Sequence, residues 1–365
     1  MIIRRGTLGQ VVEVESLEQF DELVASGATS MHGWRLQGLD LTGRGDALRS
    51  LDPAGALVLG GRLSPADEPS LRDRGALLFP QVPELPFDAY RSALYTADEL
   101  YAGVADGYER TPDATIYAWS GDTGDVAAKL AEALHDHSVD DALQDFVEGR
   151  RLVGVMGGHA ARRGTEEYAE AARLGQGLAR RDLVVCTGGG PGAMEAANLG
   201  ARAAGLHETD LKDTLEELAR VPHYSPSVQA WAESALDVLR RLPGGADTLG
   251  IPTWFYGHEP PNVFASHIAK YFRNALREDT LLELCDAGIV FLPGAAGTVQ
   301  EIFQDACENY YAAPAARAPM VLVGRRYWTE TLPAWPLLRA LADRAELGDL
   351  VQLVDTVEEA CEHIG

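Results

Sequence analysis

The chain has 365 residues, of which 46% are hydrophobic, and a formal net charge of −24. This composition supports a globular core and argues against nucleic acid or an anionic membrane surface as the main partner. The N-terminal Met1-Ile-Ile-Arg-Arg lacks a signal-peptide core, no apolar run reaches membrane length and the four cysteines are scattered, so we expect a reduced, cytoplasmic protein.

The first part of the chain, residues 1–148, is expected to form a small accessory α/β domain. It carries no motif with an evident chemical role, and its elements are short and separated by turn-forming residues. In order, the pattern predicts a helix over Leu17–Ala25, strands at Ala56–Gly60 and Ala76–Phe79, a short helix opened by Thr96 and Glu99, a polar loop over 103–124, and one or two helices within Asp125–Val147.

Residues 149–365 alternate strands and helices regularly, which predicts a Rossmann-like, doubly wound parallel sheet. Strands are expected at Leu152–Met156, Leu183–Cys186, Leu249–Tyr256, Ala287–Leu292, Met320–Val323 and Leu350–Val354. Helices are expected after Thr165, from the first glycine loop to about Ala204, and over Val263–Leu284. Further helices are expected from the second glycine loop to Tyr311, over Leu332–Arg344 and at the C-terminus. An acidic helical insertion, 206–247, interrupts the alternation and is expected over the site or at a subunit contact.

Two of the predicted strands run into glycine-rich loops that lead directly into helices. One reads Gly188-Gly-Gly-Pro-Gly-Ala-Met-Glu195, and the other reads Pro293-Gly-Ala-Ala-Gly-Thr-Val-Gln-Glu301. A helix start offers unpaired N–H groups and the positive end of the helix dipole, so each loop is suited to bind a phosphate. Each loop alone could equally be a tight turn without a ligand. Two such loops on one sheet favour a single ligand held between them.

The loop pair resembles the LOG (LONELY GUY) family of nucleoside 5′-monophosphate phosphoribohydrolases, which includes nucleotide monophosphate nucleosidases and carries an old "lysine decarboxylase-like" label. The resemblance covers residues from about Leu152 to the C-terminus. One position departs from the family loop Pro-Gly-Gly-x-Gly-Thr, because the second glycine is Ala295 here. Alanine does not adopt positive φ at low cost.

The resemblance implies a hydrolase that releases a free base and ribose 5-phosphate, without a cofactor. Its catalytic carboxylate corresponds to Glu301, and its arginine to Arg277 by spacing, with Arg273 as a competitor because the family's His-Glu-Arg-Lys context is absent. Glu301 could instead complete a capping box with Thr298. The expected substrate and phosphate contacts are Gly157, Gly158, Gly188, Gly189, Gly190, Gly192, Glu195, Pro293, Gly294, Ala295, Ala296, Gly297 and Thr298. Glu195 could equally serve only its own helix dipole.

Other chemistries fit the sequence less well. The chain has only three lysines, and Lys270 alone lies near the motifs, which argues against a pyridoxal phosphate enzyme. We expect Lys270, Arg273 and Arg277 to share one helix face. A dinucleotide site is disfavoured because the acidic residue about twenty positions on falls in the insertion. No metal-ligand spacing is evident.

The main alternative to the hydrolase is a non-catalytic sensor or carrier that binds a nucleotide or a phosphorylated cofactor on the same fold. Tyr256, His258 and Asn262 follow a predicted strand end and could contact the base or ribose. The amphipathic insertion and the family resemblance predict a homo-oligomer, a dimer or tetramer. The expected partner is a nucleoside monophosphate, with neither nucleic acid nor a membrane.

Overall fold

The computed structural model describes residues 3–6, 9–121, 125–242, 244–255 and 259–364. The chain divides into two compact units, of which the first comprises residues 1–93 with 123–142 and the second comprises residues 94–122 with 143–365. The boundary expected near residue 148 therefore differs from this division, because residues 94–122 pack with the C-terminal part of the chain.

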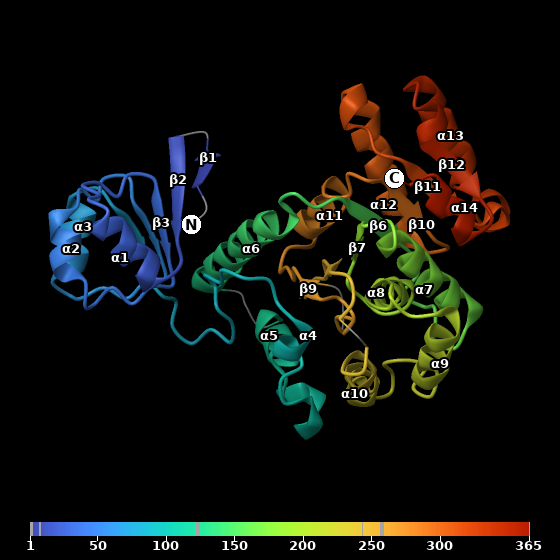
Figure 1. The fold of residues 1–365 in the computed structure, drawn as a ribbon, viewed down its shortest axis with the longest axis horizontal. Coiled ribbons are helices and arrows are strands. Elements are labelled where there is room, and N and C mark those ends of the chain that lie inside the picture. The colour runs from blue at the N-terminus through green and yellow to red at the C-terminus, as the bar shows by residue number, and fades with distance from the viewer. Residues whose placement is uncertain (1–2, 7–8, 122–124, 243, 256–258, 365) are drawn as a thin grey trace. The chain divides into compact units, whose positions relative to one another are not determined.

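The first unit contains a five-stranded sheet in the order β1-β2-β3-β4-β5 (Figure 1). The pair β1/β2 is antiparallel and the remaining pairs are parallel. The strands are β1 Ile3–Gly6, β2 Gly9–Val14, β3 Trp34–Gln37, β4 Leu57–Leu59 and β5 Leu77–Phe79. Helices α1 Leu17–Ala25, α2 Gly45–Ser50 and α3 Asp67–Asp73 connect the parallel strands.

Local signals account for the elements of this unit that the sequence predicted. Helix α1 has the expected bounds because Ser16 forms a capping box with Gln19 and because Phe20 is buried in the core. Strands β4 and β5 lie inside the predicted apolar runs. The sequence did not predict strands β1 to β3 or helices α2 and α3. They are short, and β2 and β3 depend on pairing with neighbouring strands, as between Val14 and Leu36.

Within residues 94–121, helical segments extend into the stretch 103–124 that was expected to be a polar loop. Helix α4 (Ala97–Leu100) is capped by Thr96 as predicted, but α5 (Pro112–Ser120) lies within the stretch expected to be irregular. Asp113 of α5 is buried and accepts hydrogen bonds from Lys270 Nζ at 2.6 Å and Trp254 Nε1 at 3.0 Å. These contacts, from residues more than a hundred positions away, hold α5 in the second unit.

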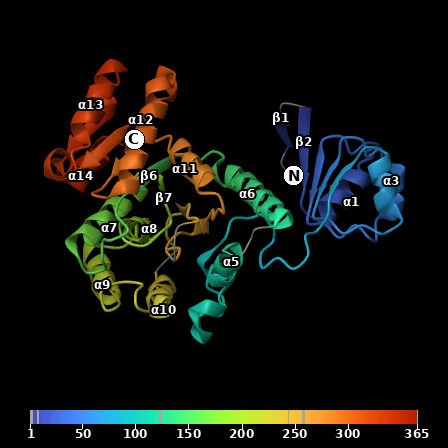
Figure 2. The ribbon, with the colours of Figure 1, turned by 180° about the vertical axis from the view of Figure 1, so that it is seen from behind.

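The second unit contains a seven-stranded parallel sheet in the order β12-β11-β10-β6-β7-β8-β9 (Figures 1 and 2). The predicted α/β class with a parallel sheet is therefore confirmed. The strands are β6 Leu152–Met156, β7 Val184–Thr187, β8 Thr248–Gly250, β9 His267–Ile268, β10 Ile289–Phe291, β11 Met320–Val323 and β12 Val351–Val354. The two central strands β6 and β10 are buried throughout, as their continuous apolar sequences require.

Helices pack in two groups around this sheet. Helix α7 contacts α8 and α14, whereas α12 contacts α11 and α13 (Figures 1 and 2). The helices of the unit, after the connecting helix α6 Val126–Val147, are α7 Glu166–Ala179, α8 Ala193–Arg202, α9 Glu208–Leu218, α10 Val228–Leu239, α11 Asn274–Glu283, α12 Ala296–Tyr311, α13 Trp335–Arg344 and α14 Val357–Glu362. No helix in the described ranges is long and apolar enough to cross a membrane.

The helix predicted over Val263–Leu284 is wrong in its first half. Helix α11 begins only at Asn274, and strand β9 occupies His267–Ile268. The apolar run from Val263 pairs with β8 instead, through contacts such as Leu249 with His267. Lys270 therefore shares no helix face with the two arginines. It is buried against Asp113.

The insertion is helical as predicted, and it consists of α9 and α10. The large apolar side chains of these helices are buried within the chain itself, with exposed fractions of 2% for Leu211, 0% for Leu218, 1% for Trp231 and 6% for Leu236. The insertion therefore buries these side chains without a second subunit.

Candidate functional site

Three loops meet at the carboxyl ends of β6, β10 and β7, which are neighbours in the sheet. The Gly158 N–H donates to Pro293 O at 3.1 Å, and the Ala193 N–H donates to Gly158 O at 3.2 Å. The chain leaves β6 toward β7 on one side and returns to β10 on the other, so the strand order reverses here. Ligands of open α/β sheets bind at such points. The structure thus brings together the two glycine loops and the Gly157-Gly158 turn.

Helix α12 begins with an uncapped, exposed first turn. Its N-cap residue is Ala295, which supplies no side-chain hydrogen bond, and residues 295–297 are exposed. The first N–H groups of a helix have no partner within it, so this turn presents donors and the positive dipole end to an anion. Ala295 has φ −106°, which lies outside the left-handed region that favours glycine.

Thr298 does not cap α12. It is the third residue of the helix, is buried, and its side chain lies against Gly294, where an added Cβ would overlap Thr298 Oγ1. The alternative capping box between Thr298 and Glu301 is therefore absent. Gly294 is required by this packing, and its carbonyl accepts a 2.6 Å hydrogen bond from the hydroxyl of Tyr327, a contact that the sequence did not suggest.

Glu301 lies one turn into α12 and carries an unusual carboxyl. Burial raises its pKa from 4.5 to about 7, Arg277 opposes this shift, and Glu278 adds to it. The side chain is half-buried, and it has no hydrogen bond to any residue in the described part of the chain. A carboxyl that titrates near neutral pH suits proton transfer in either direction.

Of the two candidate arginines, the structure brings Arg277 into the site. Its Nε donates to Ile251 O at 2.7 Å, and its Nη2 donates to Gly188 O at 3.3 Å. The guanidinium therefore lies on the first glycine loop, with its charge felt at Glu301. Arg273 is the N-cap residue of α11 and is exposed. The two arginines are four positions apart, about one helical turn, yet it is the Arg277 guanidinium that lies on the glycine loop.

The loop 188–192 is buried and held by internal contacts. Gly189 has φ +71° and packs on Pro252, and Gly192 has φ +78° and approaches Gly158 O, so both positions exclude a side chain. Asn262 donates its backbone N–H to Gly189 O at 2.8 Å and its Nδ2 to Gly190 O at 3.1 Å. These contacts account for the glycines structurally, and their part in ligand binding stays a prediction.

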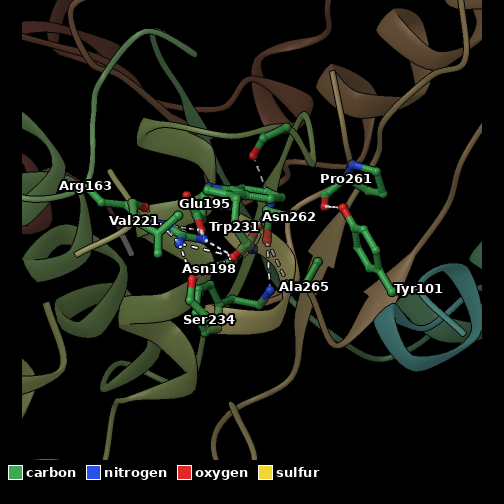
Figure 3. A network of polar contacts seen from close by, with 12 residues as sticks. Tyr101, Arg163, Glu195, Asn198, Val221, Trp231, Ser234, Pro261, Asn262 and Ala265 are labelled. Carbon is green, nitrogen blue, oxygen red and sulfur yellow. Dashed lines mark hydrogen bonds and ion pairs between the residues drawn. The ribbon is translucent and has the colours of Figure 1, made fainter. Parts of the chain in front are cut away.

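Glu195 forms a buried ion pair with Arg163, a residue that the sequence reading missed (Figure 3). The two side chains are each 1% exposed, and Arg163 Nε lies 3.0 Å from Glu195 Oε1. Arg163 also donates to Val221 O, Trp231 O and Ser234 Oγ, and its guanidinium lies 4.8 Å from the Trp231 ring centroid. Glu195 thus fastens the insertion to α8 through Arg163. Figure 3 shows the Glu195 side chain directed toward Arg163.

The remaining candidates divide by what the structure describes. Asn262 is buried, and its Oδ1 accepts hydrogen bonds from the N–H groups of Phe264 and Ala265 (Figure 3). Tyr256 and His258 lie outside the described residues. Within the described ranges, no three His, Cys, Asp or Glu side chains are grouped as ligands for a metal ion.

Comparisons with known proteins match parts of this chain. Residues 150–208 match the sequence profile of the SLOG cluster4 family. The pyrimidine/purine nucleotide 5′-monophosphate nucleosidase of Escherichia coli strain K12 is 28% identical over 155 residues, which are 42% of this chain and 26% of that protein. The matched segment thus spans about a quarter of the relative's length. The same similarity holds for the nucleosidase of strain O157:H7.

Solved structures resemble part of the chain at low identity and low TM-score. The Moco carrier protein from Chlamydomonas reinhardtii is 18% identical with a TM-score of 0.36, over 58% of this chain and 94% of that one. TM1055, a structural genomics target, is also 18% identical, with a TM-score of 0.35 over 58% of this chain and 96% of that one. The chain therefore matches the SLOG cluster4 family over residues 150–208 and is similar over part of its length to a nucleotide monophosphate nucleosidase.

Proposed function

We propose that the protein hydrolyses the N-glycosidic bond of a nucleoside 5′-monophosphate, releasing the free base and ribose 5-phosphate. The observation that carries this proposal is Glu301, a carboxyl with a pKa of about 7 that stands one turn inside the exposed N-terminus of α12. The helix N-terminus can bind an anion, and about one turn further on Glu301 can transfer a proton. These two features match the 5′-phosphate and the C1′ end of a nucleotide's ribose phosphate.

The chemistry follows from this arrangement. The phosphate binds the first-turn N–H groups of α12, and Arg277 adds positive charge nearby. As the bond between C1′ and the base nitrogen breaks, the ribose gains oxocarbenium character, which an ionised Glu301 stabilises. The base leaves with the electron pair of the broken bond. Glu301 takes a proton from water as the water oxygen bonds to C1′, and passes that proton to the departing base. Paired charge stabilisation and water activation also drive glycosidases.

Similarity to a nucleotide nucleosidase supports this ligand class. That similarity covers less than half of the chain, so activity, substrate and catalytic residues are all part of the proposal. The site geometry supports Arg277 ahead of Arg273, because Arg277 contacts the glycine loop whereas Arg273 is exposed.

Incubation with AMP, GMP, CMP and UMP, followed by chromatography for free base, tests the proposal. We expect base release from at least one monophosphate and none from the matching nucleoside, since phosphate contacts contribute much of the binding. Binding without any base release would instead identify a nucleotide or phosphorylated-cofactor carrier. Equal affinities for the nucleoside and the nucleotide in calorimetry would contradict a phosphate-binding site at the N-terminus of α12.

A further inference from the structure

Glu259 lies at the opposite end of the Gly188–Gly190 strip from Arg277. Its Oε2 is 3.8 Å from the position of a Cβ on Gly190, whereas Arg277 Nη2 is 2.6 Å from the corresponding position on Gly188. The two glycines are two positions apart, which an extended chain spans in at most about 7 Å. The strip therefore has a cation at one end and an anion at the other, within the reach of one small molecule.

The carboxylate of Glu259 is open to a ligand. Its side chain is 37% exposed, and its recorded ionic neighbour is His159 Nδ1, at 3.7 Å from Oε1. No residue in the described ranges donates a hydrogen bond to it. His159 follows the Gly157-Gly158 turn and is itself 55% exposed. Glu259 thus offers two acceptor oxygens beside the turn that borders the site.

The insertion places an aromatic pair near this carboxylate. The rings of His223 and Tyr224 stack with centroids 4.2 Å apart, and the Tyr224 ring meets Trp231 edge-on. Burial raises the pKa of Tyr224, and the negative charge of Glu259 raises it further. The Arg163 N–H donates to Pro222 O at 3.1 Å, so the Arg163 contacts position this segment.

Charge decides which end of a nucleotide meets Glu259. A phosphate is repelled by the carboxylate and attracted by Arg277 and the α12 N-terminus. The base end of the ligand therefore extends toward Glu259 and the aromatic pair. A carboxylate only accepts hydrogen bonds, so it favours a base with adjacent donors.

We propose that Glu259 selects the base of the nucleotide, and that the preferred base is guanine. Guanine offers two adjacent donors, N1–H and the exocyclic N2 amino group, to the two oxygens of one carboxylate. Adenine and cytosine present an acceptor beside their amino group, and hypoxanthine lacks the N2 donor. This inference rests on the proposed function for its ligand class, a nucleoside monophosphate.

Comparison of the wild type with Glu259→Gln on GMP, IMP and AMP tests the assignment. We expect the wild type to prefer GMP over AMP by roughly 10–100-fold in kcat/KM, the scale of a bidentate base contact, with IMP in between. Glu259→Gln should abolish the preference, because an amide offers one donor beside one acceptor and so pairs with adenine N1 and N6 as well as with guanine O6 and N1. Equal rates on GMP and AMP in the wild type, or an unchanged ratio in the variant, would overturn the assignment.

A binding measurement separates this inference from the proposed function. Calorimetry with GMP and AMP on Glu301→Gln, and on Glu301→Gln combined with Glu259→Gln, reports base selection without turnover. If no monophosphate releases a base but GMP binds better than AMP only while Glu259 is present, the hydrolase proposal fails and the base assignment stands. Equal binding of GMP and AMP to Glu301→Gln overturns the assignment. Glu362→Gln, at an exposed position of α14, is the matched control and should leave the preference unchanged.

Discussion

Glu301 unites a stability cost and a proposed catalytic role in one side chain. Its folded-state pKa of about 7 exceeds the ordinary 4.5, so the folded protein holds this proton more tightly than the unfolded chain does. Its stabilising contribution is therefore full below pH 4.5 and is lost as pH rises through about 7. Above that pH the folded state carries a partly buried carboxylate.

Glu301→Gln should remove both the cost and the chemistry. We expect the free energy of unfolding at pH 8 to rise by up to about 3 kcal/mol, at 1.36 kcal/mol per pKa unit, with little change at pH 4. Base release should fall roughly 10²–10⁴-fold, with nucleotide binding retained. Denaturant titration at both pH values and turnover assays measure the two effects. An active variant would place the proton transfer on another residue.

Arg277 should set the pH dependence of the reaction as well as its rate. Its charge lowers the pKa of Glu301, so Arg277→Ala should move the rising limb of log kcat/KM to higher pH, besides cutting turnover. Arg273→Ala, which removes an exposed residue, should leave the limb in place and reduce turnover less. pH–rate profiles of both variants decide between the arginines, and the reverse order would assign the role to Arg273.

Two glycines on either side of the α12 N-cap, Gly294 and Gly297, have different physical requirements. A Cβ at Gly294 would overlap the Thr298 side chain, whereas a Cβ at Gly297 would meet nothing within 4 Å. The sequence presents both as loop glycines. The structure assigns Gly294 to packing and leaves open space beside Gly297, where we place the phosphate.

Alanine at these two positions should separate packing from ligand binding. Gly297→Ala should raise the free energy of unfolding by about 0.4–1 kcal/mol, since its backbone suits alanine, yet weaken nucleotide binding. Gly294→Ala should instead destabilise the protein through the Thr298 overlap. Thermal unfolding with and without a monophosphate measures both. Unchanged affinity in Gly297→Ala would move the phosphate away from this turn.

At the scale of the whole molecule, a buried ion pair makes residues 94–122 part of the second unit. Lys270 and Asp113 are both 2% exposed and lie 2.6 Å apart, and Tyr108 also donates to Asp113 at 2.8 Å. Removing one member of such a pair leaves a buried, uncompensated charge.

Asp113→Ala should therefore lower the free energy of unfolding by about 3–5 kcal/mol. Adding Lys270→Met should restore much of the loss, because it removes the stranded charge. Denaturant unfolding of the single and double variants gives the coupling. Independent, additive losses would show that the pair does not fasten α5 to the unit.

The homo-oligomer stays a prediction, tested by sedimentation at micromolar concentration, where a single monomer species would contradict it. The apolar surface of the insertion no longer supports an oligomer, because its residues Leu211, Leu218, Trp231 and Leu236 are buried within the chain. Exposed apolar residues of the second unit, Tyr311 and Leu337 at 81% and 58%, remain available for a contact.

The sequence by itself determined the elements whose causes are local. Continuous apolar runs predicted β6 and β11 to the residue, and the pattern over Leu17–Ala25 predicted α1 with its observed bounds. The order of strands, glycine loops and helices also sufficed for the parallel sheet, because strand–helix alternation with loops at strand ends has few alternative topologies. The sequence therefore sufficed to predict both glycine loops at strand ends, with Glu301 in the helix that follows the second loop.

Only the tertiary structure decided what depends on distant partners. Arg163 meets Glu195 across 32 positions, Lys270 meets Asp113 across 157, and no local pattern marks either pair. The apolar run before Asn274 reads as a helix until pairing with β8 makes it a strand. Likewise, the pKa of Glu301 follows from burial and from Arg277. Burial, charge coupling and β-pairing are properties of the folded chain, so a local sequence pattern cannot predict them.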